Sequence, residues 1–293
     1  MFHSGEQAVQ QRMGQAEVAA RVGRSIRAEI PAVAASFLAE QSMVVLGAAD
    51  PAGRLWASPL TGPAGFVRAV GAATIDIDTR LDDADPLSAA LAGAVEVGLI
   101  ALQPQRRRRM RVNGRSAVRD GGVRIATDQV YANCPKYISR RHIREMSALG
   151  SPGPVRRGTA LTTAAVEMIG AADTFFVATA DADGHADASH RGGNPGFLQV
   201  LSPTQLRWPD YRGNSMFMTL GNLMVQPRCG LLVADWSNGA LLQLTGRAEL
   251  VWDAAVFTTG AQCAVDFVVD EVIERPGALA VRWGPPELSP NNP

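Results

Sequence analysis

The sequence predicts a mainly β protein with short helices, built from two copies of one small antiparallel barrel. One observation is an internal repeat, because residues 49–66 align with residues 180–197 at a constant offset of 131. Another is that the apolar stretches are strand-sized and separated by turns, in a chain with 29 Gly and 18 Pro. The repeat is also much longer than the roughly 20–50 residues of a solenoid unit. Two similar domains therefore fit better than a helical bundle or a repeat array.

The repeat rests on eight identities in eighteen aligned positions. These pairs are Ala49/Ala180, Asp50/Asp181, Gly53/Gly184, Ala57/Ala188, Ser58/Ser189, Gly62/Gly193, Gly65/Gly196 and Phe66/Phe197. The similarity continues at an offset of 132, where residues 98–100 face 230–232 and residues 114–115 face 246–247. Both copies are therefore expected to fold alike.

Each copy has the same order of predicted elements. It starts with an amphipathic helix, over residues 30–41 or 162–170, and continues with a strand over 43–46 or 174–178. Asp and Gly residues then predict a tight turn. The further strands are expected at 56–58, 65–70, 95–102 and 109–118 in the first copy, and at 186–189, 196–201, 230–235 and 240–250 in the second. With little room for crossover helices, such strands favour a small antiparallel barrel.

The predicted domain boundaries follow from the repeat. We expect a first domain over residues 1–146 and a second over residues 158–293. Residues 147–157 (SALGSPGPVRR) are small or rich in Pro and Gly, which is typical of a linker.

Composition excludes several classes of protein. The 28 basic residues balance 28 acidic ones, so no global field favours nucleic acid or an anionic membrane as partner. The amino-terminal stretch lacks the apolar core of a signal peptide, and no stretch has the length of a membrane span. Three distant cysteines indicate neither a disulfide framework nor a metal site. We therefore expect a cytoplasmic protein without a metal.

The two copies differ where a ligand could bind. The second copy has Ser189, His190, Arg191 and Gly192 where the first has residues 58–61, with sequence SPLT. A hydroxyl and a guanidinium beside glycines are suited to a phosphate group. Further along, Tyr211, Arg212 and Asn214 precede a predicted helix, whose free N–H groups also favour an anion. The second copy is thus the expected anion site.

Several motifs resemble the pyridoxamine 5'-phosphate oxidase-like family, which has an FMN-binding split β-barrel. In the second copy these are SHRGGNPGF, WPDYRGNSMF, TLGNLMVQPRCGLLVADW and LQLTGRAEL. In the first copy FHSGEQAVQ, WASPLTGPAGF, RRRMRVNGR and QVYANCPKYI resemble a two-barrel subgroup. The resemblance implies tandem split barrels that pack as a pseudo-dimer within one chain.

The resemblance also implies a cofactor site, with FMN between the barrels. Ser189 and Arg191 match one part of the family's phosphate site, and Tyr211, Arg212 and Asn214 match the other. The chain departs from the oxidase itself, which has a Ser-x-Lys-like turn where this sequence has Arg212-Gly213-Asn214-Ser215. Flavin binding is therefore expected, whereas oxidation of vitamin B6 is not.

Other residues are candidates for contacts with the flavin ring. Trp236 would lie at the edge of the ring or in the core, and Gln243 would bind the pyrimidine edge or face solvent. Lys136 leaves the first barrel at a point from which it can reach the cofactor. Arg106 to Arg109 and Arg111 form the densest charge run. On a strand, Arg107, Arg109 and Arg111 would share one face, where they would stabilise negative charge near the flavin N1 or bind the phosphate of a nicotinamide cosubstrate, unless the run is simply solvated.

The expected function is FMN-dependent oxidoreduction of a small-molecule redox substrate, or of a nicotinamide cosubstrate, by a protein that forms a possible homodimer. The flavin carries the hydride chemistry, so the sequence identifies no catalytic residue. Three alternatives remain open: a flavin-binding protein without turnover, a barrel that binds deazaflavin F420 or haem, and a scaffold with an empty site. Haem would need an axial ligand, for which His190 is the candidate.

Overall fold

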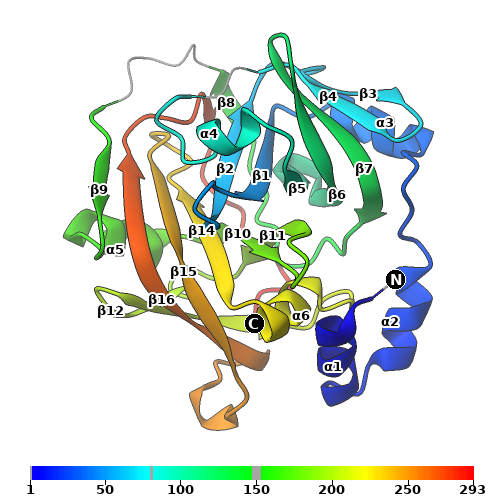
Figure 1. The fold of residues 1–293 in the computed structure, drawn as a ribbon. Coiled ribbons are helices and arrows are strands. Elements are labelled where there is room, and N and C mark those ends of the chain that lie inside the picture. Colours follow the sequence, from blue (N-terminus) through cyan, green and yellow to red (C-terminus); the bar gives the residue numbers. More distant parts are fainter. Residues whose placement is uncertain (1, 80–81, 147–152) are drawn as a thin grey trace.

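The fold consists of two antiparallel sheets with the same strand order (Figure 1). A computed structural model describes residues 2–79, 82–146 and 153–293. The first barrel has the order β2-β1-β5-β6-β7-β4-β3, and the second has the order β11-β10-β14-β15-β16-β13-β12. Each strand of the first barrel thus has a counterpart in the second. Because each sheet is an open path between two edge strands, the barrels are split, and the predicted fold class is confirmed.

The strand bounds follow the repeat closely. In the first barrel the strands are β1 (Met43–Ala49), β2 (Leu55–Thr61), β3 (Val67–Gly71), β4 (Thr74–Ile77), β5 (Glu96–Gln103), β6 (Arg108–Arg119) and β7 (Gly122–Ala132). In the second they are β10 (Thr174–Ala180), β11 (Ala186–Gly192), β12 (Gln199–Ser202), β13 (Gln205–Tyr211), β14 (Arg228–Ala234), β15 (Leu241–Val251) and β16 (Ala261–Arg275). The helices are α1 (Ser4–Arg12), α2 (Ala16–Gly23), α3 (Ala32–Ala39), α4 (Ser88–Leu91), α5 (Thr163–Ala171) and α6 (Met218–Val225).

The repeated Asp-x-x-Gly turn has the same structure in both copies. Asp50 Oδ1 accepts hydrogen bonds from the backbone N–H groups of Ala52 and Arg54, each at 2.9 Å. Asp181 Oδ1 accepts from the N–H groups of Asp183 and His185 at the same distance. The glycines that follow have positive φ, 75° at Gly53 and 90° at Gly184, which residues with a side chain rarely adopt. Backbone geometry therefore explains why the repeat keeps these residues.

The two barrels pack face to face through glycines as well as through apolar side chains. A Cβ at Gly98 of β5 would lie 2.4 Å from the backbone nitrogen of Ala188 in β11. In the equivalent place, a Cβ at Gly230 of β14 would lie 2.5 Å from the carbonyl oxygen of Leu55 at the start of β2. Around them an apolar cluster joins the barrels, with Val45 and Ile100 from the first and Phe176 from the second. This close approach aligns β6 of one barrel with β11 of the other.

The ends of the chain do not stay with the nearer barrel. Val9 of α1 belongs to the core of the second barrel, and a Cβ at Gly5 would lie 2.2 Å from the carbonyl oxygen of Gly221 in α6. Figure 1 shows α1 beside α6, with α2 on the other side of α1. Strand β8 (Ile143–Met146) pairs with β17 (Val281–Trp283) from the other end of the chain. The amino-terminal helices therefore border the second barrel's ligand region.

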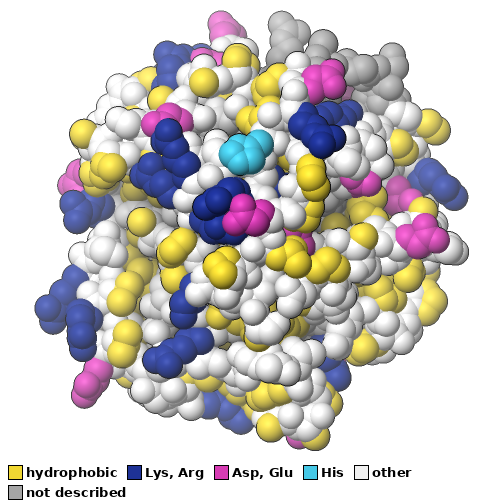
Figure 2. Space-filling model, turned by 180° about the vertical axis from the view of Figure 1, so that it is seen from behind, with side chains coloured by type: hydrophobic (Ala, Val, Ile, Leu, Met, Phe, Trp, Pro, Cys, Tyr) yellow, Lys and Arg dark blue, Asp and Glu magenta, His cyan; other side chains and the backbone are white. Residues whose placement is uncertain are grey.

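Part of the expected linker has a regular structure. Residues 147–152 lie outside the described ranges, whereas β9 (Arg156–Gly158) pairs with residues 272–274 of β16. Among the described helices, none is both long and apolar enough to cross a membrane. On the face shown in Figure 2, basic side chains are interspersed with acidic ones, as the neutral total charge predicts.

Candidate functional site

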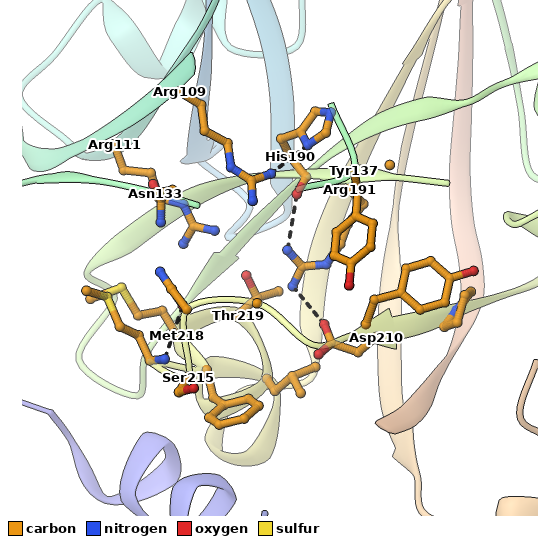
Figure 3. A pocket seen from close by; sticks show the side chains of 18 residues that line it. Arg109, Arg111, Asn133, Tyr137, His190, Arg191, Asp210, Ser215, Met218 and Thr219 are labelled. Carbon is orange, nitrogen blue, oxygen red and sulfur yellow. Dashed lines mark hydrogen bonds and ion pairs between the residues drawn. The ribbon is translucent and has the colours of Figure 1, made fainter. Parts of the chain in front are cut away.

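A cavity lies where the first barrel meets the loop before α6 of the second. From the first barrel it is lined by Arg109 and Arg111 of β6 and by Asn133 and Tyr137 beyond β7. From the second it is lined by residues 190–192 of β11, residues 209–211 of β13 and residues 213–220. Its volume is about 80 Å³, because side chains fill most of the space. Figure 3 shows the arginines of both barrels pointing into it.

Strand alternation puts Arg109 and Arg111 on the same face of β6. Arg111 Nη1 lies 3.0 Å from Asp187 Oδ2 of β11, and both side chains are buried. Arg191 Nη2 lies 3.3 Å from Asp210 Oδ1 of β13. Two of the three guanidinium groups are thus partly neutralised.

Arg109 differs from the other two arginines, because within the described ranges it has no carboxylate partner. Its Nη1 instead lies 2.7 Å from His190 Nδ1. Burial, together with the positive charges of Arg111 and Arg191, lowers the pKa of Arg109 to about 9. A buried cation among other cations is destabilised until an anion joins it. Arg109 is therefore the residue through which this cavity would gain most from binding an anion.

His190 is held neutral in the same cluster. Burial first, and then the charges of Arg109, Arg191 and Arg111, lower the pKa of His190 well below its usual value. Since a guanidinium group only donates, His190 Nδ1 must accept from Arg109, so the ring proton lies on Nε2.

Buried donors in the cavity lack partners. In the part of the chain that the structure describes, His190 Nε2 and the Nε atoms of Arg109, Arg111 and Arg191 form no hydrogen bond. The Nε atoms of some other arginines are also unpaired, so what distinguishes this cavity is that four such donors surround it. Asn133 Oδ1 is the one unpaired buried acceptor among the described lining residues. Donors are therefore in excess, and an anion fits best.

The backbone around the cavity is strained. Across the described ranges, four non-glycine residues have positive φ, and three of them line the cavity: Tyr137 at 67°, Ser215 at 66° and Phe217 at 58°. Phe217 immediately precedes α6, and none of the described side chains caps this helix. The free N–H groups of the first turn of α6 therefore face the cavity edge, where they favour negative charge. Strain of this kind clusters at functional sites.

Gly192 allows the segment that follows β7, which we call the first barrel's exit segment (residues 133–138), to reach the site. A Cβ at this position would lie 1.9 Å from the carbonyl oxygen of Tyr137. Tyr137 then packs its ring 5.1 Å from that of Tyr211, and its hydroxyl donates to the Arg212 carbonyl at 3.0 Å. Three segments far apart in the sequence are joined here.

The structure brings together half of the expected cofactor-binding residues. His190, Arg191, Gly192, Tyr211 and Asn214 line the cavity. Asn214 Oδ1 also accepts from the N–H of Met216 at 3.1 Å, which shapes the loop before α6.

Ser189 and Arg212 lie next to the cavity lining rather than in it. Ser189 Oγ is buried 2.7 Å from Thr219 Oγ1, so Thr219 presents the hydroxyl at the cavity. Arg212 is exposed, because the turn after β13 points its side chain to solvent, and its backbone carbonyl holds Tyr137 instead. Lys136 lies outside the lining, and its neighbour Tyr137 takes the place expected for it.

Trp236 and Gln243 lie elsewhere. Trp236 packs edge-on against Trp283, with ring centroids 5.8 Å apart, in the cluster between the barrels. Gln243 is fully buried, and its Nε2 donates to Ser58 Oγ at 2.9 Å. The site combines β11 of the second barrel with β6 of the first, whereas Gln243 is on β15 and faces β2. Neither residue lines the cavity, so the expected contact of each with a flavin ring stays a prediction.

Sequence reasoning missed several residues of the lining. Arg109 and Arg111 were expected from strand alternation to share a face with Arg107, and the structure places both of them in the lining. The rest of the charge run lies elsewhere: Arg106 pairs with Glu40, Arg107 with Glu287, and Arg108 lies over the ring of Phe37. Asn133, Asp210, Ser215 and Thr219 also line the cavity, and their positions depend on how the barrels meet.

The first barrel has an equivalent of this cavity, but it contains its own anion. The offset of 131 pairs Leu60 with Arg191, and the offset of 132 pairs Gln243 with Arg111. The equivalent space, also about 80 Å³, is lined by Ser58, Leu60, Asp85 and Arg275 among others. Asp85 accepts hydrogen bonds from Ser58, Gln243 and Arg275, so a carboxylate of the chain occupies this space.

Fold and site together define a split-barrel protein with an arginine-lined cavity between two barrels of one chain. Residues 161–277, which run from before α5 to just past β16, match the pyridoxamine 5'-phosphate oxidase family. This match confirms, for the second barrel, the resemblance to pyridoxamine 5'-phosphate oxidase-like proteins. None of the curated proteins matches the chain.

Three solved structures of similar fold each cover well under half of the chain. HupZ of Group A Streptococcus is 13% identical, with 37% of this chain and 89% of that chain covered at a TM-score of 0.32. A putative pyridoxamine 5'-phosphate oxidase of Lactobacillus delbrueckii is 20% identical, with 39% and 94% covered at a TM-score of 0.32. An FMN-binding protein of Syntrophomonas wolfei is 9% identical, with 37% and 84% covered at a TM-score of 0.31.

Proposed function

We propose that the chain binds one FMN, with its phosphate in the cavity between the barrels, and that it acts as an FMN-dependent oxidoreductase. The observation that carries the proposal is the unpaired Arg109, in a cavity with four unsatisfied buried donors. The family match of residues 161–277 gives this anion site a chemical context. A phosphate has the charge and the acceptor oxygens that the cavity lacks.

The residues that would hold the phosphate come from both barrels. Arg191 and Asn214 belong to the second barrel and Arg109 to the first, and the start of α6 adds backbone N–H groups. The cavity of about 80 Å³ has room for a phosphate but not for a flavin ring. The ring would need adjoining space or a movement of side chains.

A bound flavin would supply hydride transfer, and the protein would supply binding and electrostatics. Arg109 and Arg111 would stabilise negative charge near the cofactor. His190 would donate from Nε2 and would remain neutral. This proton position argues against the haem alternative. An axial ligand needs a ring nitrogen with an available lone pair, whereas here Nε2 carries the proton and Nδ1 accepts from Arg109.

The first test is the visible spectrum of the purified protein, before and after addition of FMN. A flavin doublet at one equivalent per chain supports the proposal, and a Soret band supports haem instead. A colourless protein that takes up no FMN would contradict flavin binding.

The second test compares two variants at equivalent positions. Arg191→Ala should weaken FMN binding about 10- to 100-fold, because a hydrogen bond to a charged group contributes roughly 1.5–3 kcal/mol. Leu60→Ala is the matched control, and it should leave the affinity unchanged because its space holds Asp85. Equal loss in both variants would show that the phosphate binds elsewhere.

A further inference from the structure

A second and larger cavity adjoins the proposed phosphate site. It has a volume of about 530 Å³ and lies between α3, the segment before it, and the start of β6 and end of β7. Arg109 and Asn133 line both cavities, so the two spaces share a wall at these residues. A space of this size is typical of sites for small organic molecules.

The walls of this cavity are mainly apolar. Phe37 of α3, Met110 of β6 and Val130 of β7 are buried side chains at its base. Val33, at the start of α3, is 69% exposed and stands at the mouth. Such walls favour a ring or another apolar body.

All the charged side chains that line the cavity are basic: Arg27, Arg107, Arg108 and Arg109. Arg107 is engaged by Glu287, 3.0 Å away. Arg27, Arg108 and Arg109 have no carboxylate partner in the described ranges, and Arg108 instead lies 4.8 Å above the Phe37 ring. Arg27 and Arg108 take no part in the proposed phosphate site, so they leave positive charge beside this apolar space. Such a space favours a ligand with an apolar body and a negative charge.

We infer that this cavity binds an apolar organic carboxylate, and that such carboxylates are the substrate class of the proposed oxidoreductase. The assignment as substrate rests on the proposed function, whereas the binding itself does not. Shared walls at Arg109 and Asn133 would hold the carboxylate ligand beside the cofactor. The cavity would thus determine which molecules the flavin meets.

Binding is tested with 2-naphthoate as the probe and with 2-naphthamide as its neutral analogue. Fluorescence titrations use the full chain, with and without FMN. We expect 2-naphthoate to bind at least 10-fold more tightly than 2-naphthamide, with little change when FMN is present. Equal affinity for the two probes would overturn the inference, because charge would then play no part.

Val33→Glu locates the site with little risk to folding. Val33 is exposed in the first turn of α3, where an acidic residue is favourable for the helix. The new charge should weaken 2-naphthoate binding about 10-fold or more by repulsion and should leave FMN affinity unchanged. Val33→Gln is the matched neutral control and should retain binding, as should Arg21→Gln on the exposed face of α2. Unchanged naphthoate binding in Val33→Glu would place the probe elsewhere.

The outcomes separate this inference from the proposed function. Selective naphthoate binding by a protein that takes up no FMN would support the carboxylate cavity and remove the flavin function. Competition between 2-naphthoate and FMN would overturn the inference, because it would show that the flavin ring itself occupies the cavity. A perturbed flavin spectrum on addition of 2-naphthoate, without loss of FMN, is the expected result.

Discussion

Arg275 and Asp85 form a buried ion pair, with Nη1 and Oδ2 2.6 Å apart, in the first barrel's equivalent of the anion cavity. In the second barrel no described carboxylate plays this role for Arg109. The duplicated fold therefore contains two similar spaces between its barrels, one closed by an internal anion and one left with unpaired cations. This difference underlies the expected stoichiometry of one FMN per chain.

Removal of Asp85 should destabilise the protein. Asp85→Ala removes the buried one of the two carboxylates that pair with Arg275, and a broken buried pair costs about 3 kcal/mol or more. Asp82→Ala is the matched control, because Asp82 also contacts Arg275 but is more exposed and should contribute below about 1 kcal/mol. Urea denaturation measures both. Equal losses would mean that Asp85 does not hold the closed site together.

Gly192→Ala should separate the first barrel's exit segment from the anion cavity. Its Cβ would overlap the carbonyl oxygen of Tyr137, so the segment must shift and take Tyr137 with it. We expect a loss of about 1–3 kcal/mol in stability, as for other overpacked sites, with weaker FMN binding. Gly170→Ala in α5 is the control, because a Cβ there meets open space and alanine favours a helix. A Gly192→Ala protein with unchanged denaturation and FMN affinity would contradict this reading.

Stability should fall as pH rises towards neutrality because of Glu6. Burial is the main cause that raises the pKa of Glu6 from 4.5 to about 7. The folded state keeps its proton between these values while the unfolded state releases it, so stability is lost as pH rises from about 4.5 to 7. Glu6→Gln retains an acceptor for the N–H of His3 and should flatten this slope, as seen in denaturation midpoints at several pH values. An unchanged slope would assign the pH dependence to other groups.

The pKa values of His185 and His190 should be shifted in opposite directions. His185 donates a hydrogen bond to the Asp181 carboxylate, and this bond raises the pKa of His185. The contribution of the pair to stability is therefore present below about pH 6.5 and is lost as pH rises through the folded-state value. His190 stays neutral well below its usual pKa because it is buried beside arginines, so it lowers stability as pH falls below about 6.5. Imidazole NMR signals, assigned with His185→Gln, measure both pKa values. A His190 signal that titrates above that of His185 would exclude the proposed proton on Nε2.

The class of fold and the duplication were predictable from the sequence alone, as was the second barrel as the place where we propose that the phosphate binds. Asp50 and Asp181, Gly53 and Gly184, and Gly98 and Gly230 recur because backbone geometry requires them, and such requirements are local enough to be visible in a repeat. Alignment of the two copies also identified Arg191 as a candidate anion ligand, because the first copy has Leu60 at the equivalent position.

Which residues share the cavity depends on how the two barrels pack. Arg109 and His190 are 81 positions apart and meet because β6 of one barrel packs against β11 of the other. Gln243 has the polarity of a flavin ligand, yet the packing of β15 against β2 places it beside Asp85 in the closed site. Neither composition nor strand alternation specifies such partners, because they depend on how two finished sheets come together in three dimensions.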